Sequence, residues 1–191
     1  MGRLIVSMNL SLDGCIEAPG QDDGSWLRID EEVHRAFNEL ATGADTFLYG
    51  RNVYEVMIPY WPDAAEDAAK PAYEREYGRL WMDTPKVVVS TSIKEPNWNT
   101  RVVSSGVFGE IERLKQKSVN YVLCYGGSQL VTALQEHNLV DEYALFIHPA
   151  ALGAGVPFFR RALSLQLRDV RRFDQGVLAL RYSSLAASVT S

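Results

Sequence analysis

The sequence predicts an α/β fold of three layers, in which helices cover both faces of a mostly parallel central sheet. Segments typical of strands alternate with segments typical of helices along most of the chain. Lys86–Ser90 and Tyr121–Tyr125 are continuous apolar runs, typical of strands that are buried on both faces. Leu165–Phe173 and Val177–Ser183 flank Asp174-Gln175-Gly176, a pattern typical of a C-terminal antiparallel hairpin.

The individual elements follow from local signals. Asp30 is a typical N-cap for a helix that continues to about Thr42, and Gly43 is a typical residue for ending it. Pro71 is suited to the start of a helix that ends near Gly78. Strands are expected at residues 3–12, 46–49, 86–90, 101–104, 121–125, 141–148, 165–173 and 177–183, helices at 30–42, 51–57, 71–78, 107–117 and 128–136, a loop at 17–26 and a surface segment at 59–70.

The composition is that of a globular protein with one domain. The chain has 191 residues, of which 47% are hydrophobic and 23% are charged. A chain of this length can bury roughly 70% of the surface that it exposes when unfolded. We expect a single domain over residues 1–191, with a small, polar tail that is frayed from about residue 184. The net charge of −5 shows no basic excess, so binding to nucleic acid is not expected.

Cysteine usage and hydropathy predict the cellular setting. Cys15 and Cys124 are far apart and fit neither a zinc site nor a disulfide framework, so no metal is expected. Cys124 lies in an apolar run and is interpreted as an inert core thiol. No apolar run approaches the ~20 residues that span a bilayer, and the first residues lack the pattern of a signal peptide. We therefore expect a reduced, cytoplasmic protein without membrane contact.

Two glycines, Gly126 and Gly127, follow the apolar run Tyr121–Tyr125 and come directly before a helix pattern that begins at Ser128. At the carboxyl end of a parallel strand, glycines let backbone N–H groups approach a ligand. The N-terminus of the following helix adds donors and a positive dipole end. The pair therefore favours a phosphate site, and a tight turn between strand and helix is the alternative interpretation.

Two further strand ends carry residues that are suited to phosphate. Gly50 and Arg51 come between a strand and a helix, and an arginine fits bidentate phosphate contacts. Ser90 and Thr91 end another strand, and a lysine follows three residues later. Each of these residues can equally be an ordinary loop or surface residue. Three such strand ends in one sheet nevertheless favour a dinucleotide, which has several phosphates to place.

Several stretches of the sequence are similar to one known family. They are SMNLSLDGCIEA at residues 7–18, GRNVYE at 50–55, KVVVSTS at 86–92, YGGSQLVTAL at 125–134 and LVDEYALFIHPAALGAGVPFF at 139–159. In order and spacing they resemble the dihydrofolate-reductase-like superfamily, and within it the branch formed by the reductase domain of the riboflavin-biosynthesis deaminase-reductase and its stand-alone relatives. The resemblance spans residue 4 to about residue 183 and implies a dihydrofolate-reductase-like fold with NADPH as cofactor.

The resemblance also implies cofactor-binding residues. Asn9 and Ile16 would flank the nicotinamide, and Arg51 would meet the adenosine 2′-phosphate or the pyrophosphate. Val53 stands where dihydrofolate reductases usually have a threonine, and Gln129 stands where some relatives have a basic residue. The full implied set is Asn9, Ile16, Gly50, Arg51, Asn52, Val53, Ser90, Thr91, Gly126, Gly127, Ser128, Gln129 and Leu130.

Candidates for the substrate side come from the same resemblance. His148, Gly153 and Gly155 belong to a segment that lies by the substrate site in the riboflavin branch, and a turn at the edge of the core is the alternative. Trp26 is a candidate wall for a planar ring, as are Tyr54, Tyr60 and Trp61, and all four can equally be core or interface residues.

Asp30 is the candidate catalytic carboxylate, because dihydrofolate reductases anchor the pteridine with a carboxylate on the helix after the first loop. A helix N-cap is the simpler interpretation of this residue. His34 and His137 are expected on the surface.

The expected function is that of an NADPH-dependent reductase that transfers a hydride to a small planar heterocycle or a related C=N or C=O compound. The nearest named activity is the pyrimidine reductase of riboflavin synthesis, whose substrate carries a ribose and a phosphate. No basic pocket for that phosphate is identifiable, and the H-x-E and P-C-x-x-C patterns of a zinc deaminase are absent. The alternatives are a non-catalytic nucleotide-binding module and a dihydrofolate reductase proper. Reductases of this branch commonly form dimers, so a homodimer is expected.

Overall fold

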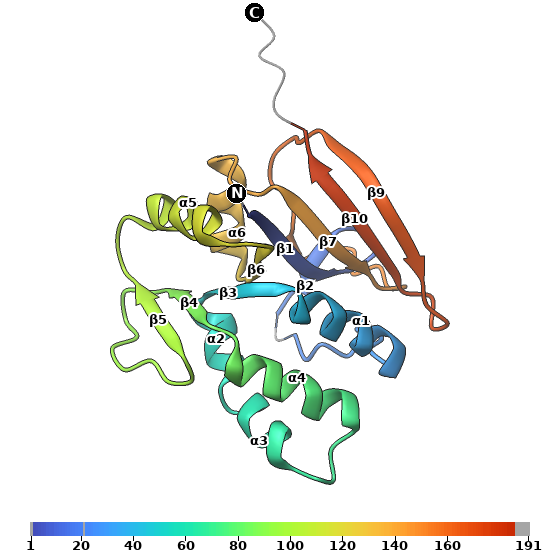
Figure 1. Ribbon diagram of the computed structural model, residues 1–191. Helices are drawn as coiled ribbons and strands as arrows, with labels where there is room; N and C mark the ends of the chain where they lie inside the picture. The colour runs from blue at the N-terminus through green and yellow to red at the C-terminus, as the bar shows by residue number, and fades with distance from the viewer. Residues whose placement is uncertain (1, 21, 186–191) are drawn as a thin grey trace, which may run out of the picture.

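The computed structural model describes residues 2–20 and 22–185, with a central eight-stranded sheet between helices (Figure 1). The strands are β1 (Arg3–Leu10), β2 (Cys15–Glu17), β3 (Ala44–Gly50), β4 (Lys86–Val89), β5 (Thr100–Val103), β6 (Tyr121–Gly126), β7 (Glu142–Ile147), β8 (Val156–Pro157), β9 (Leu165–Arg172) and β10 (Leu178–Ser184). The helices are α1 (Glu31–Thr42), α2 (Arg51–Met57), α3 (Trp61–Glu66), α4 (Ala72–Asp83), α5 (Val107–Lys117) and α6 (Ser128–Glu136).

The strand order in the sheet is β5-β4-β3-β6-β1-β7-β10-β9. The strands from β5 to β7 are parallel to their neighbours, whereas β10 is antiparallel to both β7 and β9. The predicted C-terminal hairpin is therefore confirmed. Ser184, where the tail was expected to begin fraying, is the last residue of β10, and residues 186–191 lie outside the described part of the chain.

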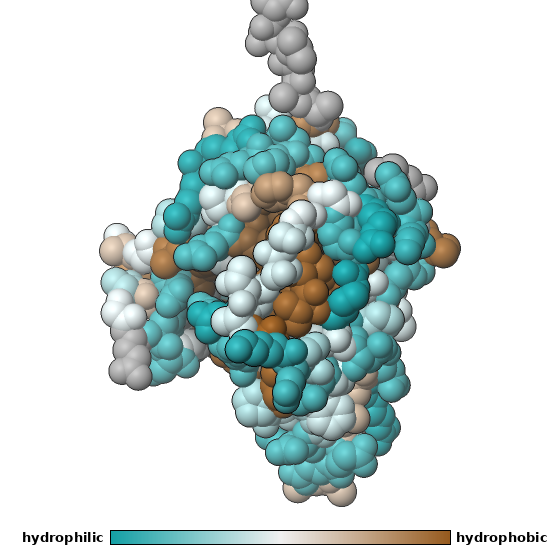
Figure 2. All heavy atoms as spheres, turned by 90° about the vertical axis from the view of Figure 1, so that its left-hand side faces the viewer, coloured by the Kyte–Doolittle hydropathy of each residue, from teal (hydrophilic) through white to brown (hydrophobic). Residues whose placement is uncertain are grey.

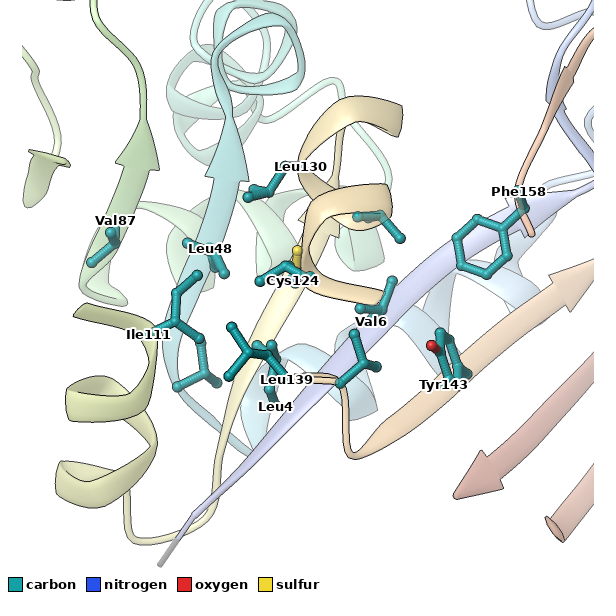
Figure 3. Close-up of a cluster of buried hydrophobic side chains, with 14 of the residues drawn as sticks. Leu4, Val6, Leu48, Val87, Ile111, Cys124, Leu130, Leu139, Tyr143 and Phe158 are labelled. Atoms are coloured by element: carbon teal, nitrogen blue, oxygen red, sulfur yellow. The ribbon is translucent and has the colours of Figure 1, made fainter. Parts of the chain in front are cut away.

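The central strands are buried on both faces, because successive side chains of a strand point to opposite sides of the sheet. Leu4 and Val6 of β1 and Cys124 of β6 belong to the core that includes side chains of α5 and α6 (Figure 3). Ile5 of β1 and Leu123 of β6 belong to the core on the other face, with side chains of α1 and α4. The predicted three-layer α/β/α fold is thus confirmed. Cys124 is a core thiol as predicted, and burial raises its pKa to about 12.

Helix α1 begins and ends as the sequence predicts. The Oδ1 of Asp30 accepts a hydrogen bond from the N–H of Val33 at 3.0 Å, which satisfies one of the first donors of the helix. Gly43 is the C-cap, and Val33 and Leu40 are buried on the face that packs toward the sheet. Glu31 and Glu32 lie in the first turn, where their negative charges interact favourably with the positive end of the helix dipole.

The segment after α2 differs from the prediction. The residues that were expected to form a surface segment contain α3, in which Ala64 and Ala65 are each 1% exposed. Helix α4 continues to Asp83 and does not end near Gly78. A Cβ at Gly78 would lie 2.7 Å from the carbonyl oxygen of Trp61, so this glycine lets α3 and α4 approach closely. A glycine inside a helix and a glycine that ends one give the same local signal, and here tertiary packing decides.

Lys86 explains where α4 ends. This lysine is 1% exposed, and its Nζ donates to the carbonyl oxygen of Thr84 at 2.8 Å and to that of Trp81. The same ammonium lies 4.5 Å from the centroid of the Trp81 ring. Burial lowers the pKa of Lys86 to about 8. A lysine at the start of an apolar strand therefore caps the carbonyl end of the preceding helix.

The surface is mostly hydrophilic on the face shown in Figure 2, where apolar atoms gather in a central hollow. Among the helices of residues 2–20 and 22–185, none is long and apolar enough to span a membrane. Within the same residues, no group of three or more His, Cys, Asp or Glu side chains is arranged to hold a metal ion.

Candidate active site

The carboxyl ends of β3 and β6 lie side by side in the middle of the sheet, and both end in glycine. Tyr49 of β3 is paired with Gly126 of β6. A Cβ on Gly50 would lie 3.1 Å from the carbonyl oxygen of Gly126, and a Cβ on Gly126 would lie 2.6 Å from Cε of Met8. Gly126 and Gly127 have φ values of 83° and 88°, which residues with side chains rarely adopt. The glycines are therefore needed for the approach of the two strands and for the turn into α6.

A cavity of about 740 Å³ opens at these strand ends, and we name it the glycine cavity. Helix α6 starts there, and its N-cap, Gly127, offers no side chain to the first N–H groups of the helix. Such N–H groups lack partners within the helix and lie at its positive dipole end, so they are suited to a phosphate. The glycine cavity is lined by these predicted cofactor residues: Gly50, Arg51, Asn52, Gly127, Ser128, Gln129 and Leu130.

Arg51 is the only lysine or arginine among the described residues that line the glycine cavity. Its Nη1 lies 3.0 Å from Oε2 of Glu55, and each of the two side chains is 48% exposed. An exposed pair of this kind contributes only about 0–1 kcal/mol to stability. The guanidinium can therefore exchange its carboxylate partner for a phosphate at little cost in folding free energy.

A second cavity, of about 650 Å³, lies next to the same strand ends, and we name it the aromatic cavity. Its aromatic lining consists of Trp26, Phe37, Tyr60, Trp61, Tyr77 and Tyr125. Four of the predicted site residues also line it: Asn9, Ile16, Trp26 and Val53. Tyr54, which sequence reasoning grouped with these aromatics, is 1% exposed and belongs to the core under α4.

The linings of the two cavities include neighbouring residues at the start of α2 and at the end of β6. Asn52 lines the glycine cavity, whereas Val53, the next residue of α2, lines the aromatic cavity. At the end of β6, Gly127 lines the glycine cavity and Tyr125 lines the aromatic cavity. A Cβ on Gly127 would lie 4.0 Å from Cγ2 of Val53, so residues of the two linings lie close together at this point. An elongated ligand that crosses this point reaches both cavities.

Asn9 is held in place by His148, which lies at the end of the neighbouring strand. His148 is fully buried, and its Nδ1 accepts a hydrogen bond from the backbone N–H of Arg28 at 2.9 Å. The proton of the neutral ring is therefore on Nε2, which lies 3.0 Å from Oδ1 of Asn9. Burial, followed by the charge of Arg28, lowers the pKa of His148 to about 4. His148 thus lies behind the aromatic cavity and fixes the amide of Asn9, whose N–H groups remain available to a ligand.

Other predicted site residues line neither cavity. The Oγ of Ser90 accepts hydrogen bonds from the N–H groups of Ser92 and Ile93, each at 3.1 Å, so this buried hydroxyl organises the turn after β4. Thr91 is exposed on the same turn. Asp30 caps α1 and has no place in the lining of either cavity.

The segment with Gly153 and Gly155 is fastened to the loop after β1. The carboxylate of Asp13 accepts the N–H of Leu152 at 3.1 Å and that of Gly153 at 2.7 Å. These two bonds, together with a stronger effect of the Ser11 hydroxyl, lower the pKa of Asp13 to about 2. A Cβ on Gly155 would lie 2.2 Å from the carbonyl oxygen of Glu17, where β2 and β8 pair. Sequence reasoning missed β2, since a strand of three residues gives no periodic signal.

A model of the RibD C-terminal domain matches residues 3–179. The chain belongs to this family. The uncharacterized protein YyaP of Bacillus subtilis is 30% identical to it over 184 residues, and the alignment covers 94% of each chain.

Solved structures share the fold of this RibD C-terminal domain family member. A protein of Shewanella sp. PV-4 that is named after riboflavin biosynthesis aligns with a TM-score of 0.71 and 22% identity, over 96% of this chain and 99% of the other. The diaminohydroxyphosphoribosylaminopyrimidine deaminase/5-amino-6-(5-phosphoribosylamino)uracil reductase of Thermotoga maritima aligns with a TM-score of 0.65 and 15% identity, over 96% of this chain and 57% of that protein. At such identities the likeness establishes a common RibD-type fold.

His34 is the clearest example of a residue of the aromatic cavity that sequence reasoning placed wrongly. It was expected on the surface, but it is 8% exposed and lines the aromatic cavity among the rings of Phe37, Tyr73 and Tyr77. Burial lowers the pKa of His34, and its Nδ1 has no hydrogen-bond partner among the described residues. A signal was present, because residues 34, 37 and 41 share one face of a helix and two of them are apolar. His137 is exposed, as predicted.

Proposed function

We propose that this protein is an NADPH-dependent reductase that transfers a hydride to a small planar heterocycle or a related C=N or C=O compound. The observation that carries the proposal is the meeting of the glycine cavity and the aromatic cavity at the ends of β3 and β6. One cavity has the donors for phosphates, and the other has the walls for planar rings. The reductase name of the Thermotoga maritima protein, which shares the fold, supports the same reaction class.

The residues of the glycine cavity fit a dinucleotide cofactor. Gly50 and Gly127 line the cavity without side chains, and the start of α6 offers N–H groups to a pyrophosphate. Arg51, which lines this cavity, would bind the additional phosphate that distinguishes NADPH from NADH. Phe108, together with Val89 and Val107, supplies an apolar wall that is suited to an adenine ring.

The aromatic cavity would bind the nicotinamide and the acceptor. When bound, NADPH supplies the hydride, so the chain has to orient two rings and exclude water from the space between them. The amide of Asn9, fixed by His148, is a directional contact, and Ile16 and Met8 are apolar walls beside it. The proton that completes the reduction comes from water, which reaches the cavity past Tyr60, a lining residue that is 40% exposed.

A calorimetric titration of the purified protein with NADPH and NADH tests the proposal, followed by NADPH oxidation with pterins, dihydrofolate, pyrimidines and quinones as acceptors. We expect micromolar binding that favours NADPH, and turnover with at least one acceptor. Binding without turnover across the panel would support the alternative of a nucleotide-binding module. The absence of binding to either nucleotide would overturn the reductase.

A homodimer, which the resemblance implied, is part of the same proposal. Light scattering of the purified chain measures this directly, and a mass equal to one chain at micromolar concentration would contradict it.

A further inference from the structure

The charged residues of the aromatic cavity are all acidic. Three carboxylates line it, those of Glu17, Asp22 and Glu74, and the described lining contains no lysine or arginine. Proteins hold phosphate groups with Arg, Lys or the N–H groups of a helix N-terminus. The N-terminus of α1 is capped by the side chain of Asp30, and α3, whose first residue Trp61 lines the cavity, is only six residues long and has Asp63 in its first turn. This cavity therefore lacks the groups that a phosphorylated substrate needs.

The groups that neighbour these carboxylates do not cancel the negative charge of the aromatic cavity. The Nζ of Lys70 lies 3.8 Å from Oε2 of Glu74 and donates to the hydroxyl of Tyr60 at 2.9 Å, so one lysine outside the lining offsets part of one negative charge. Asp22 accepts the N–H groups of Ala18 at 2.6 Å and Gly24 at 2.8 Å, and these bonds hold its pKa below the usual value. Asp22 is thus ionised at neutral pH.

The buried imidazole in the wall of the cavity adds no positive charge. The imidazole of His34 is more than nine-tenths buried, lines the cavity, and has no partner for its Nδ1 in the described structure. Because burial lowers its pKa, this ring is neutral at pH 7 and adds no positive charge. Around it, the rings of Trp61, Tyr73 and Tyr77 have centroids 4.9 to 6.0 Å from that of His34. The wall is therefore aromatic, with neutral or acidic polar groups.

We propose that the aromatic cavity takes an uncharged or cationic planar ring without a phosphate group, and that such a ring is the acceptor of the hydride. The reduction itself rests on the proposed function, whereas the selectivity rests on the lining alone. For an uncharged ring, the balanced step is the transfer of a hydride from NADPH and of a proton from water, which gives the dihydro ring, NADP⁺ and hydroxide. A cationic ring takes the hydride alone and becomes the neutral dihydro ring. The chain would then differ in substrate class from the uracil reductase of Thermotoga maritima, whose name includes a phosphoribosyl group.

Matched flavins test this selectivity, because lumiflavin, riboflavin and FMN share one planar ring and only FMN carries a phosphate. Quenching of flavin fluorescence gives the dissociation constants, measured without nucleotide and with saturating NADP⁺. We expect lumiflavin and riboflavin to bind at least about tenfold more tightly than FMN, since the phosphate meets like charges at short range. Binding of FMN that equals or exceeds that of riboflavin would overturn the proposal, as would the failure of all three rings to bind.

Charge variants show whether the carboxylates cause the difference. Glu17→Gln together with Glu74→Gln removes two of the three negative charges and keeps hydrogen-bonding capacity. We expect the riboflavin-to-FMN ratio to fall severalfold in this double variant and in each single variant to a lesser degree. Glu66→Gln is the matched control, because it removes the same charge from an exposed position of α3 outside the cavity. An unchanged ratio in folded charge variants would remove the electrostatic basis of the proposal.

The nucleotide titration separates this inference from the proposed reductase. If NADPH binds and FMN binds as tightly as riboflavin, the proposed reductase function is supported and the proposed selectivity against phosphorylated rings is wrong. If neither nucleotide binds but riboflavin still binds more tightly than FMN, the proposed reductase function is wrong and the proposed selectivity is supported.

Discussion

The glycine cavity and the aromatic cavity adjoin each other but are built in different ways. The glycine cavity lies at the ends of the parallel strands β3, β4 and β6 and at the starts of the helices α2, α5 and α6, and four of its lining residues are glycines. The aromatic cavity is made of side chains from β1, β2, α1, α2, α3, α4 and β6 and from the loop before α1. Changes in backbone freedom should therefore disturb the first cavity, and changes in side-chain charge or packing should disturb the second.

Gly127→Ala is expected to have the largest effect. A side chain at a φ of 88° costs about 1–3 kcal/mol of strain, and the added methyl group stands at the start of α6. We expect the affinity for NADPH to fall by roughly 10- to 100-fold, which corresponds to about 1.4–2.8 kcal/mol, and riboflavin binding to stay within about twofold. Calorimetry and flavin quenching measure the two affinities.

The control for that variant is Gly20→Ala. Gly20 also has a positive φ, of 85°, and a Cβ there meets no atom within 4 Å. It carries a comparable backbone constraint but lines neither cavity. A parallel loss of NADPH and riboflavin binding in Gly127→Ala would show that the two cavities are not independent.

Arg51→Ala is expected to act on the glycine cavity alone and to distinguish the two nucleotides. We expect the affinity for NADPH to fall roughly tenfold, or about 1.4 kcal/mol, and the affinity for NADH to change by less than about threefold. Arg35→Ala is the control, because Arg35 forms a similar exposed pair with Glu31 one turn away and lies outside both cavities. An equal loss of affinity for NADPH and NADH would indicate that Arg51 contacts the pyrophosphate, which both nucleotides contain.

His148 should make folding stability depend on pH. Its pKa is about 4 in the folded protein and about 6.5 in the unfolded chain, so the unfolded chain binds more protons between these values. The stability that the neutral ring contributes is therefore fully present above pH ~6.5 and is lost progressively as the pH falls toward 4. We expect the urea midpoint to fall over this range, and His148→Gln to flatten the fall.

His137→Gln is the control for the pH dependence, since His137 is exposed near the end of α6. His34→Gln should flatten the curve as well, because burial lowers the pKa of His34 in the same direction. A curve that His148→Gln leaves unchanged would contradict the buried, neutral state of this ring.

Asp13→Asn is expected to have the smallest effect and to stay local to the aromatic side. The carboxylate accepts two backbone N–H groups of the neighbouring loop, and an amide offers only one acceptor oxygen. We expect faster hydrogen exchange at Leu152 and Gly153 and no change in NADPH affinity. Because the pKa of Asp13 is lowered to about 2, its contribution is present above pH ~4 and is lost as the pH falls through 2. Unchanged exchange at these two amides would show that the contact does not fasten the loop.

Local signals in the sequence were enough for most elements of the sheet and for the helices α1, α2, α5 and α6. The proximity of Gly50, Gly126 and Gly127 could be predicted from the sequence. The carboxyl ends of parallel strands lie at the same edge of a sheet, so residues that are distant in the chain come together there. The error at Gly78 has a different origin, because a glycine gives no sign of whether it ends a helix or lets a second helix approach. The same holds for Lys86, whose buried ammonium is explained by the carbonyl groups of α4 and by nothing in its own strand.

The order of strands and helices, the candidate phosphate-binding strand ends and the family resemblance can all be inferred from patterns along the amino-acid sequence. Only the tertiary structure decided which side chains face one another in the aromatic cavity. Glu17, Asp22 and Glu74 come from segments with no local relation, and so does His34. Their common placement depends on the packing of α1, α3 and α4 against the sheet and on the approach that Gly78 permits. Packing between distant segments is a property of the whole fold, and for that reason the acidic, aromatic character of the proposed substrate site emerges only in three dimensions.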